Sequence, residues 1–226
     1  MPYATRFEST RQAAICRLVS FPVLLSACAA DHIAGPTRPP LPGPLAASVR
    51  PCGAEPGFFA GTPLADREAW YGKQLRAMNE QRLCADSSYI LESYRFTWIP
   101  SFHPAVVVRI DLTPTGYRLT GKILTGAGGY EPGSLAKQIT RPLSEAEFGR
   151  FSELLRSAQF WELPTNLPLF GCDGTQWILE VLSSKGYHVV DRWTPYEEGP
   201  NRRFRAVGEW LLASSDLVPA TLVKGY

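Results

Sequence analysis

Alternating apolar and polar residues along the chain predict six β-strands. Alternation with a period of two is typical of strands that have two unlike faces. The expected strands are residues 94–98, 106–112, 117–123, 136–140, 175–182 and 187–193. Most of them are separated by links of hairpin length, which favours antiparallel pairing.

Three further segments carry apolar residues at helical spacing. The first runs from the expected N-cap Thr62 to about Arg82. The second opens at the capping-box pair Ser144 and Glu147, and the third covers residues 201–213. This order predicts a single α+β domain, with a mainly antiparallel sheet of about six strands, helices packed on one face and water on the other.

The last two expected strands form a hairpin that holds most of the residues able to do chemistry. A three-residue loop, Ser184-Lys185-Gly186, would close it with the glycine at positive φ and set Val181 opposite Val189. A two-residue loop would set Glu180 against Asp191, and like-charge repulsion disfavours that register. With the longer loop, the polar side of the hairpin carries Glu180, His188 and Arg192.

Residues 1–27 have the features of an export signal. Three arginines precede an apolar run that is too short to span a bilayer. The run ends in Leu25-Ser26-Ala27-Cys28, which resembles the lipobox of bacterial lipoproteins. The resemblance implies cleavage before Cys28 and lipidation of its thiol, with ordinary signal cleavage near Ala29 or Ala30 as the alternative. Because alanine and not aspartate follows Cys28, we expect the periplasmic side of the outer membrane.

Removing the signal leaves a chain with no net charge. The full sequence has 23 Lys and Arg against 21 Asp and Glu, and the signal takes three Arg and one Glu. The mature chain therefore has 20 basic and 20 acidic residues. This balance argues against nucleic-acid binding. The expected partners are the membrane, through the lipid, and an envelope protein or an anionic envelope polymer.

Residues 28–63 are rich in proline and glycine, and we expect them to form a tether to a globular domain over residues 64–226. The periplasm is oxidising, so cysteines that remain after export can pair. Cys52 and Cys84 flank the first helical segment, so the expected arrangement is a Cys52–Cys84 disulfide and a free Cys172.

A motif in the last hairpin resembles one in uncharacterised exported bacterial proteins. Residues 173–180 and 187–195 match D-G-x-x-W-x-L-E followed by Y-H-x-V-D-R-W-x-P. Tyr94-Arg95-Phe96, Phe102-His103 and residues 126–130 are similar too. The resemblance covers residues from about 87 to 212 and implies one domain, but it transfers no activity to this chain.

Two groups of cationic side chains are candidates for binding an anion. The polar face of the sheet would carry Arg95, Arg109, Arg118, Lys122, His188 and Arg192, with Asp111 and Glu180 as counter-charges. The first turn of the last helix, where free N–H groups favour anions, carries Arg202, Arg203 and Arg205. The alternatives are an ordinary solvated sheet face, and neutralisation of the helix arginines by Glu197 and Glu198.

Catalysis is the alternative to binding. His103 or His188 could act as a base with Glu180 or Asp173, as an envelope hydrolase would require. The sequence contains no zinc-binding motif, nucleophile elbow or phosphate loop, so no metal or cofactor is expected. Asp191 falls on the apolar side of the hairpin, where we expect it to accept a structural hydrogen bond from a tryptophan N–H or a backbone amide.

The leading hypothesis from the sequence is therefore a lipid-anchored envelope protein whose domain binds a ligand without catalysis. An envelope hydrolase is the second possibility, and a structural or assembly subunit of an envelope complex is the third. Convergent histidine and carboxylate groups in a deep pocket would favour the hydrolase, and an exposed apolar patch would favour the subunit.

Overall fold

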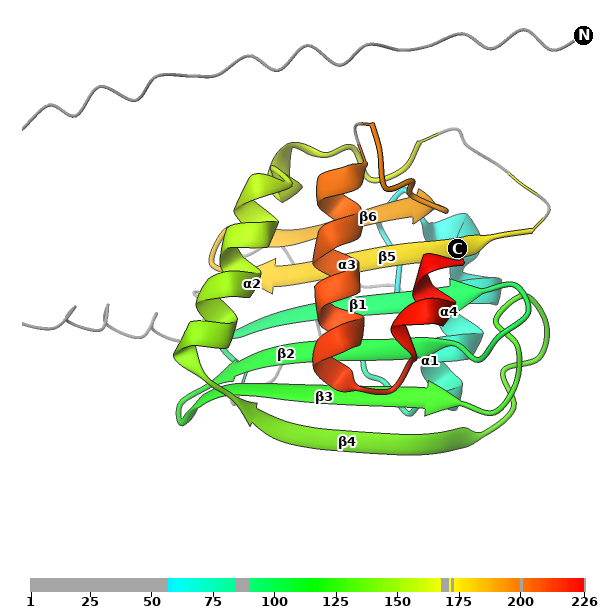
Figure 1. Cartoon of the computed structure of the whole chain (residues 1–226), viewed down its shortest axis with the longest axis horizontal. Helices are drawn as coiled ribbons and strands as arrows, with labels where there is room; N and C mark the ends of the chain where they lie inside the picture. The colour runs from blue at the N-terminus through cyan, green and yellow to red at the C-terminus, as the bar shows by residue number, and fades with distance from the viewer. Residues whose placement is uncertain (1–56, 84–89, 168–170, 172, 200, 226) are drawn as a thin grey trace, which may run out of the picture. The chain divides into compact units, whose positions relative to one another are not determined.

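The computed structural model describes residues 57–83, 90–167, 171, 173–199 and 201–225 (Figure 1). Within these residues, six β-strands form a single antiparallel sheet in the order β4-β3-β2-β1-β5-β6. The strands are β1 (Glu92–Pro100), β2 (Val106–Thr113), β3 (Gly116–Leu124), β4 (Leu135–Leu143), β5 (Thr175–Ser183) and β6 (Gly186–Trp193). The α+β class and the six-stranded antiparallel sheet predicted from the alternation are confirmed.

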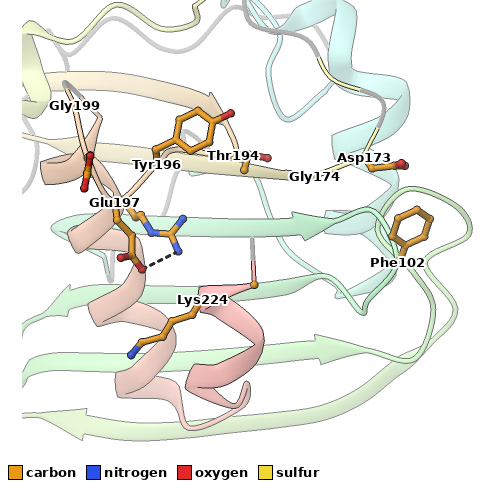
Figure 2. Close-up of a pocket in the computed structure, with 11 residues that line it drawn as sticks. Phe102, Asp173, Gly174, Thr194, Tyr196, Glu197, Gly199 and Lys224 are labelled. Atoms are coloured by element: carbon orange, nitrogen blue, oxygen red, sulfur yellow. Dashed lines mark ion pairs between the residues drawn. The ribbon is translucent and has the colours of Figure 1, made fainter. Parts of the chain in front are cut away.

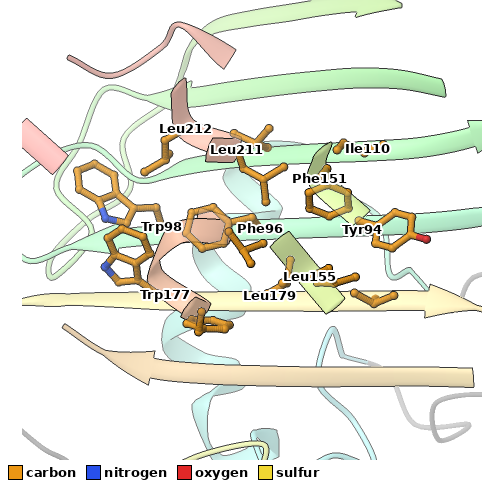
Figure 3. Packing of buried hydrophobic residues seen from close by; sticks show 14 of the residues in the cluster. Tyr94, Phe96, Trp98, Ile110, Phe151, Leu155, Trp177, Leu179, Leu211 and Leu212 are labelled. Atoms are coloured by element: carbon orange, nitrogen blue, oxygen red, sulfur yellow. The ribbon is translucent and has the colours of Figure 1, made fainter. Parts of the chain in front are cut away.

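Helices α2 (Glu145–Ser157) and α3 (Arg202–Ser215) lie on one face of the sheet, and the short α4 (Ala220–Lys224) follows α3 (Figure 1). The capping box is confirmed: Ser144 Oγ accepts from Glu147 N, and the Glu147 side chain accepts from Ser144 N. The core between these helices and the sheet includes Tyr94, Phe96, Trp98, Ile110, Phe151, Leu155, Trp177, Leu179, Leu211 and Leu212 (Figure 3). This is the face that the alternating pattern predicts to be apolar.

The opposite face of the sheet is covered by residues 57–83, the covering segment, so the prediction that water covers this face is wrong. Within the segment, a 3₁₀ turn (Ala65–Arg67), a π-helical turn (Glu68–Gly72) and helix α1 (Lys73–Ala77) follow one another. A second core forms between the segment and the sheet, from Phe58, Phe59, Leu64, Tyr71, Leu75, Met78, Ile99, Ala105, Val107, Leu124, Ile178 and Val189. Helical elements therefore lie on both faces, and the central strands are buried on both sides.

The covering segment differs from the continuous helix expected over residues 62–82. Glu68 folds back along it: Oε2 accepts from the backbone N–H groups of Phe58 (2.8 Å) and Phe59 (3.1 Å), and Oε1 pairs with Arg76 at 2.8 Å. A Cβ atom at Gly72 would overlap this carboxylate. Gly72 has no side chain and so makes room for the Glu68 carboxylate. These two residues begin and end the π-helical turn, which is wider than an α-helical one. These contacts hold the two phenylalanines that start the second core.

The β5–β6 hairpin has a register one residue away from the predicted one. Gly186 has the expected positive φ of 105°, but it pairs with Ser183, which leaves a two-residue loop. Val181 consequently faces His188 and not Val189. Since β-strand side chains alternate between faces, this slip moves every residue of β6 to the other face. The apolar pattern does not exclude this register, because both faces of the sheet are apolar: the structure buries Val190 under α2 and α3 and Val189 under the covering segment.

Candidate functional site

The expected basic sheet face is a buried ion network beneath the covering segment. Arg95 and Glu180, both fully buried, form a bidentate pair: Nε donates to Oε2 and Nη2 to Oε1, each at 2.7 Å. Glu180 Oε1 also accepts from the Tyr187 hydroxyl at 2.9 Å, and Arg95 Nη1 donates to the carbonyl of Gln81 at 2.6 Å. A planar guanidinium matched to a carboxylate in this way is a structural anchor between the sheet and the segment.

The rest of the ion network centres on Glu80, which the sequence reasoning did not place near the sheet. Its carboxylate pairs with Lys122 and Arg109, each at 2.7 Å. Arg109 also reaches Asp111 at 3.1 Å. The network thus sets Arg95, Arg109 and Lys122 against Glu80, Asp111 and Glu180. Arg118, with 46% of its side chain exposed, lies 3.5 Å from Asp111 at the edge of this network. With Arg118 included, four cations meet three carboxylates, but Arg95, Arg109 and Lys122 are held in ion pairs beneath the covering segment.

Arg192 and Arg205 are also held inside the fold. Arg192 is 2% exposed, and its Nη atoms donate to the carbonyls of Thr165 (3.2 Å), Asp191 (2.7 Å) and Pro164 (2.9 Å). This ties the outer edge of β6 to the chain that follows α2. The sequence predicts Arg192 and Arg205 on solvent-exposed surfaces; this is wrong, because both side chains are buried and hold neighbouring segments together.

Arg205 is 3% exposed and joins the start of α3 to its neighbours. Its guanidinium donates to the carbonyls of Pro195 (2.7 Å) and Val223 (3.2 Å) and to Glu209 at 2.8 Å. The expectation that all three helix arginines form one exposed anion site is therefore wrong. Arg202 and Arg203 are exposed, and Arg203 donates to the carbonyl of Ser157 at 3.3 Å.

His188 does not meet Glu180, because the observed register places them on opposite faces of the sheet. The His188 ring packs against Phe160 and Trp161, with centroids 5.0 and 5.8 Å away, and its Nε2 is 3.0 Å from the carbonyl of Leu163. Burial lowers the pKa of His188 below its ordinary value. The oriented His188–Glu180 base considered for a hydrolase is not assembled.

Asp191 lies in the second core and bonds to a partner other than the expected tryptophan or backbone amide. The Tyr71 hydroxyl donates to Asp191 Oδ2 at 2.9 Å. Burial raises the pKa of Tyr71 far above its ordinary value, so the phenol keeps its proton. Burial also raises the pKa of Asp191 to about 6, although the hydrogen bond from Tyr71 and the charges of Arg67 and Arg192 oppose that rise.

An open cleft of about 1030 Å³ lies at the end of the sheet where β1 and β6 finish (Figure 2). Its walls include Phe102 from the β1–β2 link, Asp173 and Gly174 before β5, and Tyr196 and Glu197 after β6. Phe102 is 53% exposed and Tyr196 is 74% exposed. Phe102 also contacts the ring of Tyr130, which is 62% exposed, with centroids 6.3 Å apart. Exposed aromatic rings gathered at an open cleft make it the strongest candidate site among the described residues.

Backbone hydrogen bonds hold the cleft in shape. The N–H of Ser101 donates to the carbonyl of Gly174 at 2.9 Å, and Gly174 N donates back to Ser101 Oγ at 3.2 Å. Thr194, with a positive φ of 38°, accepts from Thr175 N through its hydroxyl at 3.0 Å. A Cβ atom at Gly174 would lie 2.6 Å from the Trp193 ring, so only glycine fits there. The loops that carry the two exposed rings are therefore fixed to the sheet.

Of the residues singled out from the sequence, the cleft contains Asp173 and Arg205, together with Glu197 and Glu198. Sequence reasoning missed the two aromatic rings. The sequence does contain a signal for the exposure of Tyr196. It is followed by Glu197, Glu198 and Gly199, and a polar turn of this kind offers an aromatic side chain no apolar neighbour to pack against. His103 is not among the described residues that line the cleft.

Several predictions concern residues outside the described part of the chain. These are the lipidation of Cys28, the Cys52–Cys84 disulfide and the free Cys172. No helix among the described residues is long and apolar enough to cross a membrane. In the same part of the chain, no three His, Cys, Asp or Glu side chains gather into a group able to hold a metal ion.

Comparison with known proteins leaves the family open. No protein-family model matches the chain, and no curated protein matches it at a significant level.

Proposed function

We propose that this protein is a lipid-anchored protein of the bacterial cell envelope whose α+β domain binds a ligand in the cleft without transforming it. Support for the anchor is the Leu25-Ser26-Ala27-Cys28 sequence at the end of a short apolar run. Support for binding is the pair of exposed rings, Phe102 and Tyr196, on loops held to the sheet. The exposed rings are the observation that carries the proposal.

Binding is favoured over catalysis because of where the candidate bases lie. The hydrolase alternative needs His103 or His188: the His188 ring packs against Phe160 and Trp161 on the sheet face opposite Glu180, and His103 is not among the described residues that line the cleft. The cleft supplies aromatic faces, carboxylates, a hydroxyl and an ammonium, which are groups that position and select a ligand. The third hypothesis, a structural or assembly subunit of an envelope complex, would use the same cleft to bind another protein of that complex.

In-cell photocrosslinking tests the proposal. A photoreactive benzoylphenylalanine at position 196 should capture an envelope component in living cells. The matched control carries the same amino acid at position 140, which is exposed on the edge strand β4, away from the cleft residues. Equal labelling from positions 140 and 196, or no adduct from position 196, would contradict a binding role for the cleft.

A further inference from the structure

The cleft has an excess of accessible negative charge. Asp173, Glu197 and Glu198 line it and are exposed. Of the two cations that line it, Arg205 is buried and already holds Glu209 at 2.8 Å together with two carbonyl groups. Glu197 lies 4.0 Å from the Arg205 guanidinium but keeps 66% of its side chain exposed (Figure 2). Three carboxylates therefore face solvent against the single ammonium of Lys224, among the described residues.

The two exposed rings add to this preference. The face of an aromatic ring carries partial negative charge and attracts ammonium and guanidinium groups. Phe102 and Tyr196 stand on two loops far apart in the sequence. Figure 2 shows Asp173 near Phe102, and Glu197, the residue after Tyr196, reaching toward the Arg205 guanidinium. One wall of the cleft thus presents an aromatic ring with a carboxylate near it, and the other presents an aromatic ring followed in the chain by Glu197 and Glu198. This combination suits a cationic group with an apolar stem.

The size and rigidity of the cleft indicate how large the ligand is. A volume of about 1030 Å³ exceeds what one amino-acid side chain occupies and suits several residues of an extended peptide. The walls are fixed by the Ser101–Gly174 and Thr175–Thr194 hydrogen bonds. Because the loops are already ordered, binding of a ligand costs little conformational entropy in the protein.

From these observations we infer that the cleft binds a basic peptide segment, with lysine or arginine side chains seated between the rings of Phe102 and Tyr196 and the carboxylates of Asp173, Glu197 and Glu198. The inference rests on the proposed function and names the ligand class. It also replaces the anionic partner expected from the sequence. Five of the cations that suggested an anion are held by ion pairs and carbonyl groups inside the fold: Arg95, Arg109, Lys122, Arg192 and Arg205. The exposed Arg118, Arg202 and Arg203 do not line the cleft.

Titration calorimetry of the full-length protein in detergent, at low salt, with defined peptides tests this inference. Acetylated and amidated tetralysine should bind, and tetraglutamate and the fully Nζ-acetylated tetralysine should not. The triple variant Asp173→Asn, Glu197→Gln, Glu198→Gln should weaken tetralysine binding by about tenfold or more. Lys224→Gln, which removes the competing ammonium, should strengthen it about twofold to threefold.

A matched triple variant separates the cleft from general electrostatic attraction. Asp66→Asn, Glu153→Gln and Glu162→Gln remove the same charge from exposed positions outside the cleft and should leave affinity within about twofold. Tyr196→Leu should weaken binding severalfold, while Tyr196→Phe should not.

Three results would overturn the inference. They are equal weakening by the two triple variants, equal binding of the acetylated peptide, and binding of spermine as tight as that of tetralysine, which would indicate a small amine as ligand. If position 196 still captures an envelope component in cells, the cleft remains a binding site and only the ligand class fails.

Discussion

The Tyr71 hydroxyl donates a 2.9 Å hydrogen bond to Asp191 across 120 residues of sequence, and it connects the covering segment to the edge strand β6. The carboxyl it meets is buried, and desolvation raises the pKa of Asp191 to about 6. In the unfolded chain an aspartate has a pKa of about 3.9. The folded protein therefore holds this proton more tightly than the unfolded chain does.

That difference predicts a pH dependence of stability. Between about pH 4 and pH 6 the unfolded chain has lost the Asp191 proton while the folded protein keeps it, so stability falls as pH rises through this window and then levels off. The contribution is on the order of 3 kcal/mol. Asp191→Asn should remove it, which urea unfolding of both proteins from pH 4 to pH 8 will measure. Asp173→Asn, at an exposed position, controls for the loss of a carboxyl; parallel profiles for wild type and Asp191→Asn would refute the prediction.

The Arg95–Glu180 pair should be costly to break on one side. Arg95→Met leaves the Glu180 carboxylate buried with Tyr187 as its remaining donor, which we expect to lower the free energy of unfolding by about 3–5 kcal/mol. The double variant Arg95→Met, Glu180→Leu removes both charges and should lose less than Arg95→Met alone. Urea denaturation measures both, and a double variant that is less stable than the single one would show that the pair acts as more than mutual neutralisation.

Two glycines in helices should respond oppositely to alanine. A Cβ atom at Gly208 of α3 would lie 2.6 Å from the Trp177 ring and 2.7 Å from Phe96, so Gly208→Ala should destabilise the protein by about 1–3 kcal/mol. A Cβ atom at Gly149 of α2 meets nothing within 4 Å, so Gly149→Ala should stabilise it by up to about 1 kcal/mol. Thermal unfolding of both variants checks the signs, and a neutral Gly208→Ala would mean that α3 can move away from the sheet.

The membrane anchor predicted from Leu25-Ser26-Ala27-Cys28 depends on one thiol. Cys28→Ala should abolish incorporation of labelled fatty acid and shift the protein from the membrane fraction to the periplasmic fraction. If the wild-type protein carries no fatty acid and fractionates as the variant does, the lipoprotein assignment fails.

The expected Cys52–Cys84 bridge would close a loop of some thirty residues that includes the covering segment. By the chain-entropy model such a bridge contributes about 3–4 kcal/mol. Peptide mapping without reduction, on protein made in the periplasm, should find this pair and a free Cys172. A bridge that contains Cys172 would contradict the assignment.

Local patterns predicted the fold class well because each signal acts within a few residues. The capping box at Ser144 and the alternation in β1, β2 and β5 depend on neighbours in sequence, and they appear as expected. The prediction of the hairpin register was wrong because a shift by one residue puts Val190 on the face where Val189 was expected, and both positions can be buried. A sheet with two apolar faces leaves the register to loop geometry alone.

The second face of the sheet was misjudged because its cover is distant in sequence. Arg95, Glu180 and Lys122 are polar in sequence, and nothing near them reveals that Glu80 and Gln81 complete a buried network. A signal for burial was present: Ile99, Val107 and Ile178 also fall on that face, and near-continuous apolar runs are typical of strands covered on both sides. The aromatic cleft depends on three separate loops and could not be assembled from the sequence.

The position of the covering segment also sets the order in which this protein can fold. The covering segment precedes every strand of the sheet in the sequence, and β6 is the last strand. The hydrogen bond of Tyr71 to Asp191 therefore forms only after 120 further residues have been made. Contacts between such distant residues slow folding, because a long loop must close before they form. Until β6 is in place the second core stays incomplete, and its apolar side chains remain open to other chains. A newly made molecule is therefore most prone to aggregate just before its last strand pairs, while the second core is still open.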